Sequence, residues 1–260
     1  MPIVKFDQRL VFFAHVPKTG GTGVVEFLRA RGGLVAFEDQ QHAAVARKYR
    51  WSRTSPQHID VDALERIMPA HFFETSFAIV RHPVDRVVSS FHFQMEVERK
   101  IWVRRDFSKW LRGLRRATMR RPYLYDNHVR PMDDLVPSEA MVFYMENGLD
   151  LIVSWLDSFL GETSPPRTIG RKNVRRETSG ARVEPSTDDL RLIEELYHVD
   201  FERFGYKINE RFAPENGERP APRRSPLPSA RLDVTSLDSL LNLAARGAQK
   251  AQAKSRSLTS

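Results

Sequence analysis

The sequence predicts an α/β domain with a central parallel sheet flanked by helices. Short apolar runs of strand length occur at residues 10–14, 77–80 and 140–145, and each leads into a segment with helical spacing. This alternation favours parallel strands joined by helical crossovers. Ligands bind at the carboxyl ends of the strands in such folds, so the loops after these runs are the candidate functional segments.

Length and composition set the outline of the chain. Its 260 residues suit one large domain with a tail. We expect a folded domain over residues 1–212, a Pro- and Arg-rich linker over 213–231, and a tail over 232–260 with a short amphipathic helix. The absence of cysteine excludes disulfides and thiolate metal sites.

The net charge of +8 favours anionic ligands such as a nucleotide, an acidic glycan or a membrane surface, and does not by itself indicate nucleic acid. The first ten residues lack the layout of a signal peptide, and no apolar run has membrane-spanning length. We therefore expect a cytoplasmic, bacterial-type protein, with peripheral contact at the inner membrane face through its basic residues.

The first motif is the strand–loop–helix segment at residues 10–28. Glycines let the backbone N–H groups of the loop approach a bound anion, and the start of the following helix adds a positive dipole end. Lys18 precedes the glycines, whereas the loop of nucleotide triphosphatases has its lysine after them. The candidate phosphate- or sulfate-binding residues are Pro17, Lys18, Thr19, Gly20, Gly21, Thr22 and Gly23.

The second motif begins where the strand at residues 77–80 ends. Arg81 is followed by a proline that begins a helix, and Ser89 lies two helical turns into the motif. Arginine suits bidentate phosphate binding, and a serine hydroxyl adds a neutral donor. Alternatively Arg81 forms a structural ion pair with Asp85 and Ser89 lies on a helix face. The presence of the first loop favours the phosphate-binding interpretation.

These two motifs resemble those of carbohydrate-type sulfotransferases, the group that includes heparan sulfate 2-O-sulfotransferase and many bacterial relatives. The resemblance implies a P-loop NTPase-like three-layer sandwich that uses PAPS (3′-phosphoadenosine 5′-phosphosulfate), releases PAP and needs no metal. It places Lys18 at the phosphosulfate, and Arg81 and Ser89 at the 3′-phosphate. Two positions depart from the family pattern: Gly23 replaces a usual Ser or Thr, and His82 replaces a common Asp or Asn.

The expected general base is His71, since removal of a hydroxyl proton suits a group with a pKa near neutrality. Its segment resembles a G-H-F-like segment of the family, although residue 70 is Ala here. A histidine packed under the neighbouring phenylalanines is the alternative, and Glu74 is the fallback base. His42 and His58 are interpreted as surface histidines.

A basic segment follows. Between residues 96 and 121 three acidic residues stand against ten basic ones, at positions 99, 100, 104, 105, 109, 112, 115, 116, 120 and 121. We expect Asp106 to cap a helix whose apolar face includes Trp110. The arginines on the other face are either a solvated surface or a docking face for an acidic glycan, an anionic acceptor or a membrane.

Weaker signals come later in the chain. Asn127 and Arg130 resemble an N-x-x-R segment that lines the acceptor cleft in bacterial relatives, with a polar surface loop as the alternative. His128 is a second possible base. Arg171 and Lys172 are expected to close over the nucleotide, or else to form a solvated loop. Residues 200–206 resemble the D-F-x-x-F-G-Y ending of bacterial sulfotransferase domains, which we interpret as packing.

The sequence thus predicts a PAPS-dependent transfer of a sulfuryl group to a hydroxyl of a glycan or glycolipid, with Lys18 stabilising charge and His71 as base. Two alternatives stay open. One is a kinase-like P-loop phosphotransferase, which needs Mg²⁺ and a lysine after the glycines. The other is a non-catalytic basic module that binds an anionic polymer or a membrane.

Overall fold

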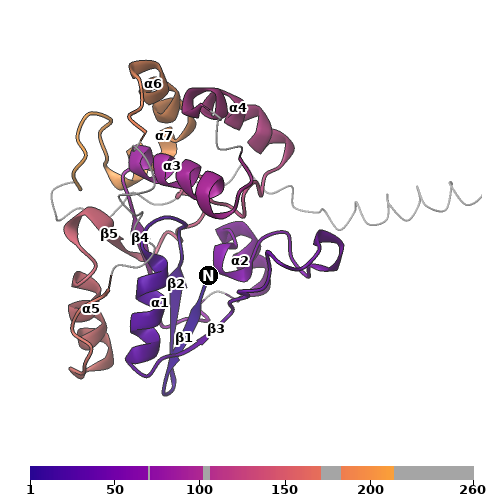
Figure 1. The fold of residues 1–260 in the computed structure, drawn as a ribbon. Coiled ribbons are helices and arrows are strands. Elements are labelled where there is room, and N and C mark those ends of the chain that lie inside the picture. Colours follow the sequence, from indigo (N-terminus) through magenta and orange to yellow (C-terminus); the bar gives the residue numbers. More distant parts are fainter. Residues whose placement is uncertain (70, 102–105, 171–182, 214–260) are drawn as a thin grey trace, which may run out of the picture. The chain divides into compact units, whose positions relative to one another are not determined.

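The computed structural model describes residues 1–69, 71–101, 106–170 and 183–213 (Figure 1). The predicted tail, the predicted linker beyond its first residue, and the predicted nucleotide-closing residues Arg171 and Lys172 lie outside these ranges. Within the described ranges, every helix is too short or too polar to cross a bilayer.

The fold is built on a mixed sheet of five strands in the order β3-β1-β2-β4-β5. β2 pairs in parallel with β4, and β4 pairs in parallel with β5. β1 is antiparallel to both β2 and β3. The sheet is therefore mixed, whereas the sequence predicted a parallel one. The strands are β1 (Ile3–Phe6), β2 (Arg9–Ala14), β3 (Leu34–Ala36), β4 (Thr75–Val80) and β5 (Met141–Tyr144).

The strand β1 was missed because its turn carries a weak sequence signal. Phe6 pairs with Arg9 across a two-residue turn, and Asp7 adopts a positive φ of 51° there. Aspartate tolerates this conformation, but the usual Asn-Gly or Asp-Gly signature of such turns is absent.

Helices cover both faces of the sheet, which confirms the predicted α/β architecture. Phe13 and Phe77 point to the face covered by α1 and α5, whereas Phe12 and Ala78 point to the face covered by α2, α3, α4, α6 and α7. In Figure 1, α1 and α5 lie together at the lower left and α3, α4, α6 and α7 gather above. The α-helices are α1 (Gly21–Ala30), α2 (Val61–Ile67), α3 (Pro83–His92), α4 (Phe107–Arg120), α5 (Leu151–Leu160), α6 (Thr187–Leu196) and α7 (His198–Phe204). A π-helical segment (Phe93–Val97) extends α3, and 3-10 turns lie at Arg47–Tyr49, Pro56–His58 and Met145–Asn147.

Local signals set several of these boundaries. The Asp106 carboxylate accepts a hydrogen bond from the Lys109 N–H at 2.9 Å, so the predicted cap of α4 is confirmed. Trp110 is 3% exposed, as expected for a core residue. Gly161 ends α5 in the left-handed conformation with φ 75°, which glycine adopts without strain.

The segment after α6 holds the fold together, as predicted for the D-F-x-x-F-G-Y ending. The buried Asp200 carboxylate accepts hydrogen bonds from the N–H groups of Met132 and Asp133, each at 2.9 Å. Arg203 donates to the carbonyl groups of Val136 and Pro137 at 2.8 and 2.9 Å. These contacts anchor the chain that leads into β5.

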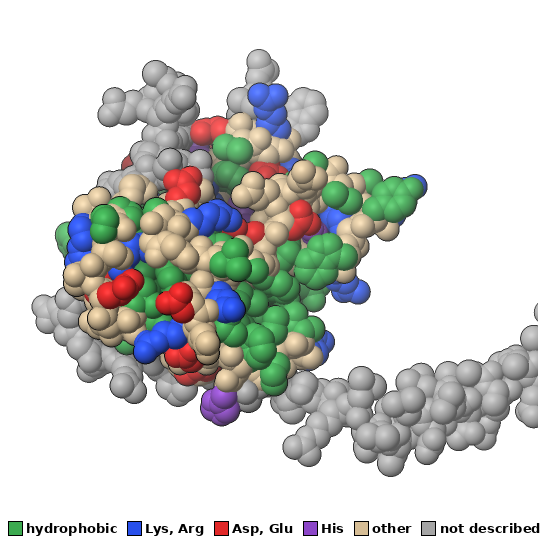
Figure 2. All heavy atoms as spheres, turned by 90° about the horizontal axis from the view of Figure 1, so that it is seen from below, with side chains coloured by type: hydrophobic (Ala, Val, Ile, Leu, Met, Phe, Trp, Pro, Cys, Tyr) green, Lys and Arg blue, Asp and Glu red, His purple; other side chains and the backbone are tan. Residues whose placement is uncertain are grey.

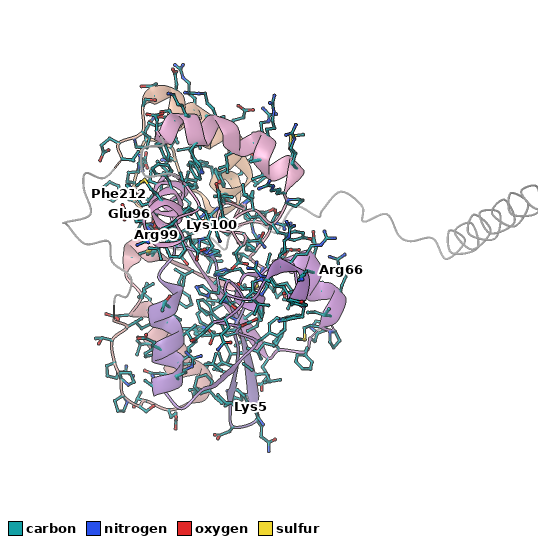
Figure 3. The ribbon with its side chains drawn as sticks, turned by 45° about the vertical axis from the view of Figure 1, so that its right-hand side comes forward. Lys5, Arg66, Glu96, Arg99, Lys100 and Phe212 are labelled. Carbon is teal, nitrogen blue, oxygen red and sulfur yellow. The ribbon has the colours of Figure 1, made fainter. Side chains whose placement is uncertain are left out.

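The carboxyl ends of β2, β4 and β5 point upward in Figure 1, away from the turn that joins β1 to β2. Figure 2 shows the opposite end, where basic and acidic side chains are interspersed around exposed hydrophobic ones. In Figure 3, Lys5 of β1 marks this lower end, whereas Glu96, Arg99 and Lys100, which follow α3, lie far above it. The candidate site is therefore at the upper end.

Candidate active site

The loop between β2 and α1 has the predicted strand–loop–helix setting. Lys18 and Gly20 adopt positive φ values of 72° and 87°, so the chain turns sharply before α1. The Thr19 hydroxyl is fully buried and donates to the Val16 carbonyl at 2.9 Å. This hydrogen bond holds the loop closed, so the Thr19 side chain supports the loop from inside.

Two glycines of the loop are required by close neighbours. A Cβ atom on Gly21 would lie 2.1 Å from the His15 ring, and one on Gly23 would lie 2.3 Å from the Gly170 carbonyl oxygen. The second contact explains why Gly23 replaces the usual Ser or Thr, since a side chain there collides with backbone. The Gly23 N–H donates to the Gly20 carbonyl at 3.1 Å, so it closes the first helical turn.

Lys18 and Arg81 are neighbours. Arg81 directly follows β4, whose parallel pairing with β2 brings Ala78 opposite Ala14. The Arg81 guanidinium donates to the Lys18 carbonyl oxygen at 3.1 Å. The two motifs, 63 residues apart in the chain, therefore meet at one point.

The Lys18 ammonium is held away from bulk water. Its Nζ atom lies 3.9 Å from the centroid of the Phe93 ring, in a cation–π contact. Burial, and secondarily the positive charge of Arg81, lower the pKa of Lys18 from 10.5 to about 8. Two cationic side chains close together in a site partly shielded from water indicate that the site binds an anion.

Ser89 and His82 occupy the helix that follows Arg81. Ser89 is partly exposed, and its hydroxyl makes no hydrogen bond within the described ranges. The His82 ring caps α3, because its Nδ1 accepts from the Val84 N–H at 3.3 Å while its Nε2 lies 3.0 Å from the Lys207 carbonyl. Burial lowers the pKa of His82, in keeping with a neutral capping ring. His82 therefore caps α3 in place of the Asp or Asn that is common at this position.

A second group of polar residues centres on His58. Its Nδ1 atom lies 2.8 Å from the Asp126 carboxylate, which also accepts from the Ser55 N–H and hydroxyl, each at 2.6 Å. Burial raises the pKa of Asp126, but the hydrogen bonds and charge of His58 and the Ser55 donors hold it well below its usual range. The ionised carboxylate only accepts hydrogen bonds, so Nδ1 of His58 donates to it, and in the neutral form of the ring Nε2 is the atom that can accept a proton.

Aromatic rings connect this group to Lys18. The His58 ring centroid lies 5.2 Å from that of His15 and 5.0 Å from that of His128. The His128 ring in turn lies 4.9 Å from the Phe93 ring, and the Phe93 ring makes the cation–π contact with Lys18. Burial, and secondarily the charge of His58, lower the pKa values of His15 and His128 well below the ordinary value, so both are neutral at pH 7.

His71 does not lie with these groups. It precedes β4, whereas the phosphate loop and Arg81 follow the carboxyl ends of β2 and β4. The six residues of β4 rise roughly 3.3 Å each, so His71 and Glu74 are at the opposite end of the strand. His71 is also exposed to solvent. The prediction that places His71, or Glu74 as fallback, beside Lys18 is therefore wrong.

The structure also corrects the interpretation of two other histidines. His42 and His58 are 4% and 9% exposed, so neither is a surface residue. The signal for His58 was faint, because it lies in a polar segment without regular periodicity.

The predicted acceptor residues have mainly structural contacts. The Asn127 side chain is fully buried and donates to the His58 carbonyl at 2.7 Å, so it positions His58 and does not line an open cleft. Arg130 pairs with Asp134 at 2.8 Å and with Asp60 at 3.2 Å, which balances its charge. A direct contact between Arg130 and an acceptor stays a prediction.

The backbone before His128 is strained. Tyr125, Asp126 and Asn127 have φ values of 52°, 55° and 62°, three consecutive residues in the left-handed region. Asp and Asn tolerate this region, but a tyrosine there costs free energy. The turn aims Asp126 at His58 and Asn127 at the His58 backbone, so the strain serves the placement of one histidine.

The same residues form a possible cation site. Single ligand atoms of His58, Asp126 and His128 lie within 4.8 Å of one another, a donor set that suits a divalent metal. His58 and Asp126 are already joined at 2.8 Å, so a metal ion would have to replace the proton between them. The Ser55 donors satisfy the carboxylate without a metal.

Comparison with known proteins gives a match to one family model. A family model described as the sulfotransferase family matches residues 2–207. No curated protein and no solved structure is significantly similar to the chain.

Proposed function

The chain belongs to the sulfotransferase family, and we propose that it transfers the sulfuryl group of PAPS to a hydroxyl of a carbohydrate, with His58 as general base. The observation that carries the proposal is the contact of Arg81 with the Lys18 carbonyl at the carboxyl ends of β2 and β4. It joins two cationic motifs into one anion-binding site.

The donor has two anionic ends, and the site has two matching sets of groups. The loop and the start of α1 supply Lys18 and backbone N–H groups for the 5′-phosphosulfate. Arg81 and the Ser89 hydroxyl, one strand away, supply donors for the 3′-phosphate. The Gly170 carbonyl lies against Gly23 at the start of α1, beside the loop.

The chemistry assigned to the protein is proton transfer and charge stabilisation. PAPS supplies the sulfuryl group, and PAP leaves with the electrons of the broken sulfur–oxygen bond. His58 accepts the proton of the acceptor hydroxyl at Nε2 as that oxygen bonds to sulfur, and Asp126 stabilises the resulting imidazolium. Lys18 donates to the oxygens that gain negative charge.

The base assignment has a matched test within the chain. His58→Ala should lower kcat by about 10²–10⁴, the usual contribution of a general base, while leaving PAP binding intact. His71→Ala should retain wild-type kcat, since His71 is exposed at the far end of β4. Loss of activity in the His71 variant together with full activity in the His58 variant would return the base role to His71.

The donor is tested by thermal shift. PAP should raise the melting temperature of the wild-type protein but not that of Lys18→Ala, whereas ATP with Mg²⁺ should have little effect. Stabilisation by ATP with Mg²⁺ and none by PAP would favour a kinase-like protein. A chelator should leave sulfuryl transfer unchanged, because a proton already bridges His58 and Asp126.

A further inference from the structure

The buried group around His58 offers a set of ligands for a metal ion. One atom each of His58, Asp126 and His128 lie within 4.8 Å of one another. Two imidazole nitrogens and one carboxylate oxygen suit Zn²⁺, whereas Mg²⁺ and Ca²⁺ prefer oxygen ligands alone. Three protein ligands and a water molecule complete a tetrahedral zinc site. The chemistry of the group therefore favours Zn²⁺.

The separations of the three ligand atoms are close to those that zinc requires. Metal–ligand distances of about 2.0–2.1 Å in a tetrahedron put neighbouring ligand atoms about 3.3 Å apart. The Nδ1 atom of His58 and the Asp126 oxygen lie 2.8 Å apart, so they would move apart by about 0.5 Å. A ring nitrogen of His128 would approach by about 1.5 Å at most. Shifts of this size need only small side-chain rotations.

Neighbouring groups hold two of the ligands in place. The Ser55 N–H donates to one oxygen of Asp126 and the Ser55 hydroxyl to the other, each at 2.6 Å. The Gln94 amide nitrogen lies 3.4 Å from Nδ1 of His128, and the Gln94 Oε1 atom is buried with no hydrogen bond in the described ranges. An amide has a donor end and an acceptor end, so Gln94 supports either tautomer of His128. Such outer contacts orient the ligands of a metal.

A metal ion at Nδ1 changes what the other nitrogen of His58 does. Without metal, Nδ1 donates its proton to Asp126, and the free lone pair is on Nε2. A zinc ion bonded to Nδ1 takes the place of that proton, and the proton of the neutral ring moves to Nε2. Nε2 is then an N–H donor and accepts no proton from an acceptor hydroxyl. The ring stays neutral and the carboxylate stays ionised, so the proton count of the site is unchanged.

We propose that His58, Asp126 and His128 form an inhibitory Zn²⁺ site, in which the ion replaces the Nδ1 proton of His58 and stops proton transfer at Nε2. The inhibition rests on the proposed function, whereas the metal site itself does not. The ion acts as a regulator and not as a cofactor, because Ser55 and His58 already satisfy the Asp126 carboxylate without it. Lys18 is not among the ligands, so donor binding is retained.

Calorimetry of the full chain with ZnCl₂, in the absence of nucleotide, tests the site directly. We expect one Zn²⁺ per chain, and a Kd raised about tenfold or more in Asp126→Asn and in His128→Gln, because each variant loses a ligand. MgCl₂ should give no binding. Cobalt gives a readout in the wild-type chain that needs no variant: bound Co²⁺ should show the visible absorption bands of a tetrahedral ion, and added Zn²⁺ should remove them.

Steady-state assays test the inhibition. Saturating Zn²⁺ should lower kcat by about 10²–10⁴, the usual contribution of a general base, and leave the KM for PAPS unchanged. A chelator should restore kcat. The rate with zinc is divided by the rate without zinc for each variant, so a change in the basal rate of His128→Gln does not affect the comparison. This variant should need about tenfold more Zn²⁺, or more, for the same inhibition.

Exposed histidines provide the controls for adventitious zinc binding. His71→Ala and His198→Ala alter exposed side chains outside the ligand set and should keep the wild-type Kd and inhibition. The site is overturned if the wild-type chain binds no Zn²⁺. It is also overturned if the Kd is unchanged in Asp126→Asn and His128→Gln variants that melt at the wild-type temperature, or if a control variant abolishes binding.

Failure of the zinc site and failure of the proposed function give different results. If His58→Ala is inactive and the wild-type chain binds PAP but no Zn²⁺, the zinc site is wrong and the proposed function stands. If Zn²⁺ binds through the three ligands and kcat does not fall, the inhibition and the base role of His58 are both wrong. If Zn²⁺ binds there but PAP does not bind and no sulfuryl group is transferred, the metal site stands and the proposed function fails.

Discussion

The lowered pKa of Lys18 predicts that the binding of PAP, the proposed product, depends on pH in a defined way. Holding the ammonium beside Arg81 and out of water lowers its pKa from 10.5 to about 8, which corresponds to about 3 kcal/mol at 1.36 kcal/mol per pH unit. The folded chain therefore releases this proton at lower pH than the unfolded chain. The folded state gains stability from this group as the pH rises from about 8 to 10.5, and bears the full cost below pH 8.

A bound phosphate group reverses this cost, because a negative charge favours the ammonium form. Only the protonated lysine binds well, so the Kd for PAP should be constant between pH 6.5 and 7.5. It should then rise about elevenfold by pH 9 and about 100-fold by pH 10, following the titration of a group with pKa about 8.

Calorimetry with PAP across this pH range measures the effect directly, and the number of protons taken up on binding gives an independent value. Lys18→Arg keeps its charge throughout and should give a nearly flat profile, whereas Lys18→Met should bind weakly at every pH. A wild-type profile that stays flat to pH 10 would refute the reasoning, since the anion would then not be in contact with Lys18.

Three further predictions test the site and its surroundings. Asp126→Asn should lower kcat by at least tenfold with little change in the KM for PAPS, because the His58 proton loses its ionised partner; equal activity across a pH-rate profile would argue against this pairing. Gly23→Ser should weaken PAP binding in calorimetry, because its Cβ would lie 2.3 Å from the Gly170 oxygen, while Gly113→Ser, at an open position, serves as the control. On the basic face of α4, Arg112, Arg115 and Arg116 should be replaced together by glutamine. This variant should have a raised KM for an acidic glycan and an unchanged KM for PAPS in steady-state assays. An unchanged KM for the glycan would show that this face is a solvated surface.

One arginine of the basic face of α4 forms an ion pair with a neighbouring helix. Arg115 pairs with Glu195 of α6 at 2.6 Å, but both side chains are more than half exposed. Exposed pairs contribute little, about 0–1 kcal/mol, so loss of this one should not unfold the protein. A change in glycan KM can therefore be attributed to binding.

The sequence was most informative where chemistry and backbone geometry coincide. The glycines around Lys18 predicted a tight loop between a strand and a helix, and α1 begins at Gly21 within that loop. Arg81 was recognisable because it directly follows an apolar strand and stands two residues before a helix-starting proline. In both cases the signal lies within about ten residues, which is the range over which local backbone preferences act.

The proposed base, His58, was harder to predict because its position depends on contacts distant in the chain. His58 and Asp126 are 68 residues apart and meet only after the segment before α2 and the turn before His128 have packed together. His71 had the better local resemblance, but the pairing of β4 with β2 places it at the far end of the sheet. His71 precedes this strand, so the rule that ligands bind after the carboxyl ends of parallel strands already argued against it, and the local resemblance was given more weight than that rule.

By itself, the sequence determined the α/β class, the glycine-rich strand–loop–helix segment at Lys18 and the second cationic motif at Arg81. Only the tertiary structure showed that these two motifs touch and that β1 runs antiparallel to its neighbours. It also showed that the rings of His58 and His128 connect to the Lys18 end of the sheet, whereas His71 lies at the other end. The physical reason is that local residues fix the conformation of each segment, whereas strand pairing and burial of the two apolar faces fix which segments share one end of the sheet.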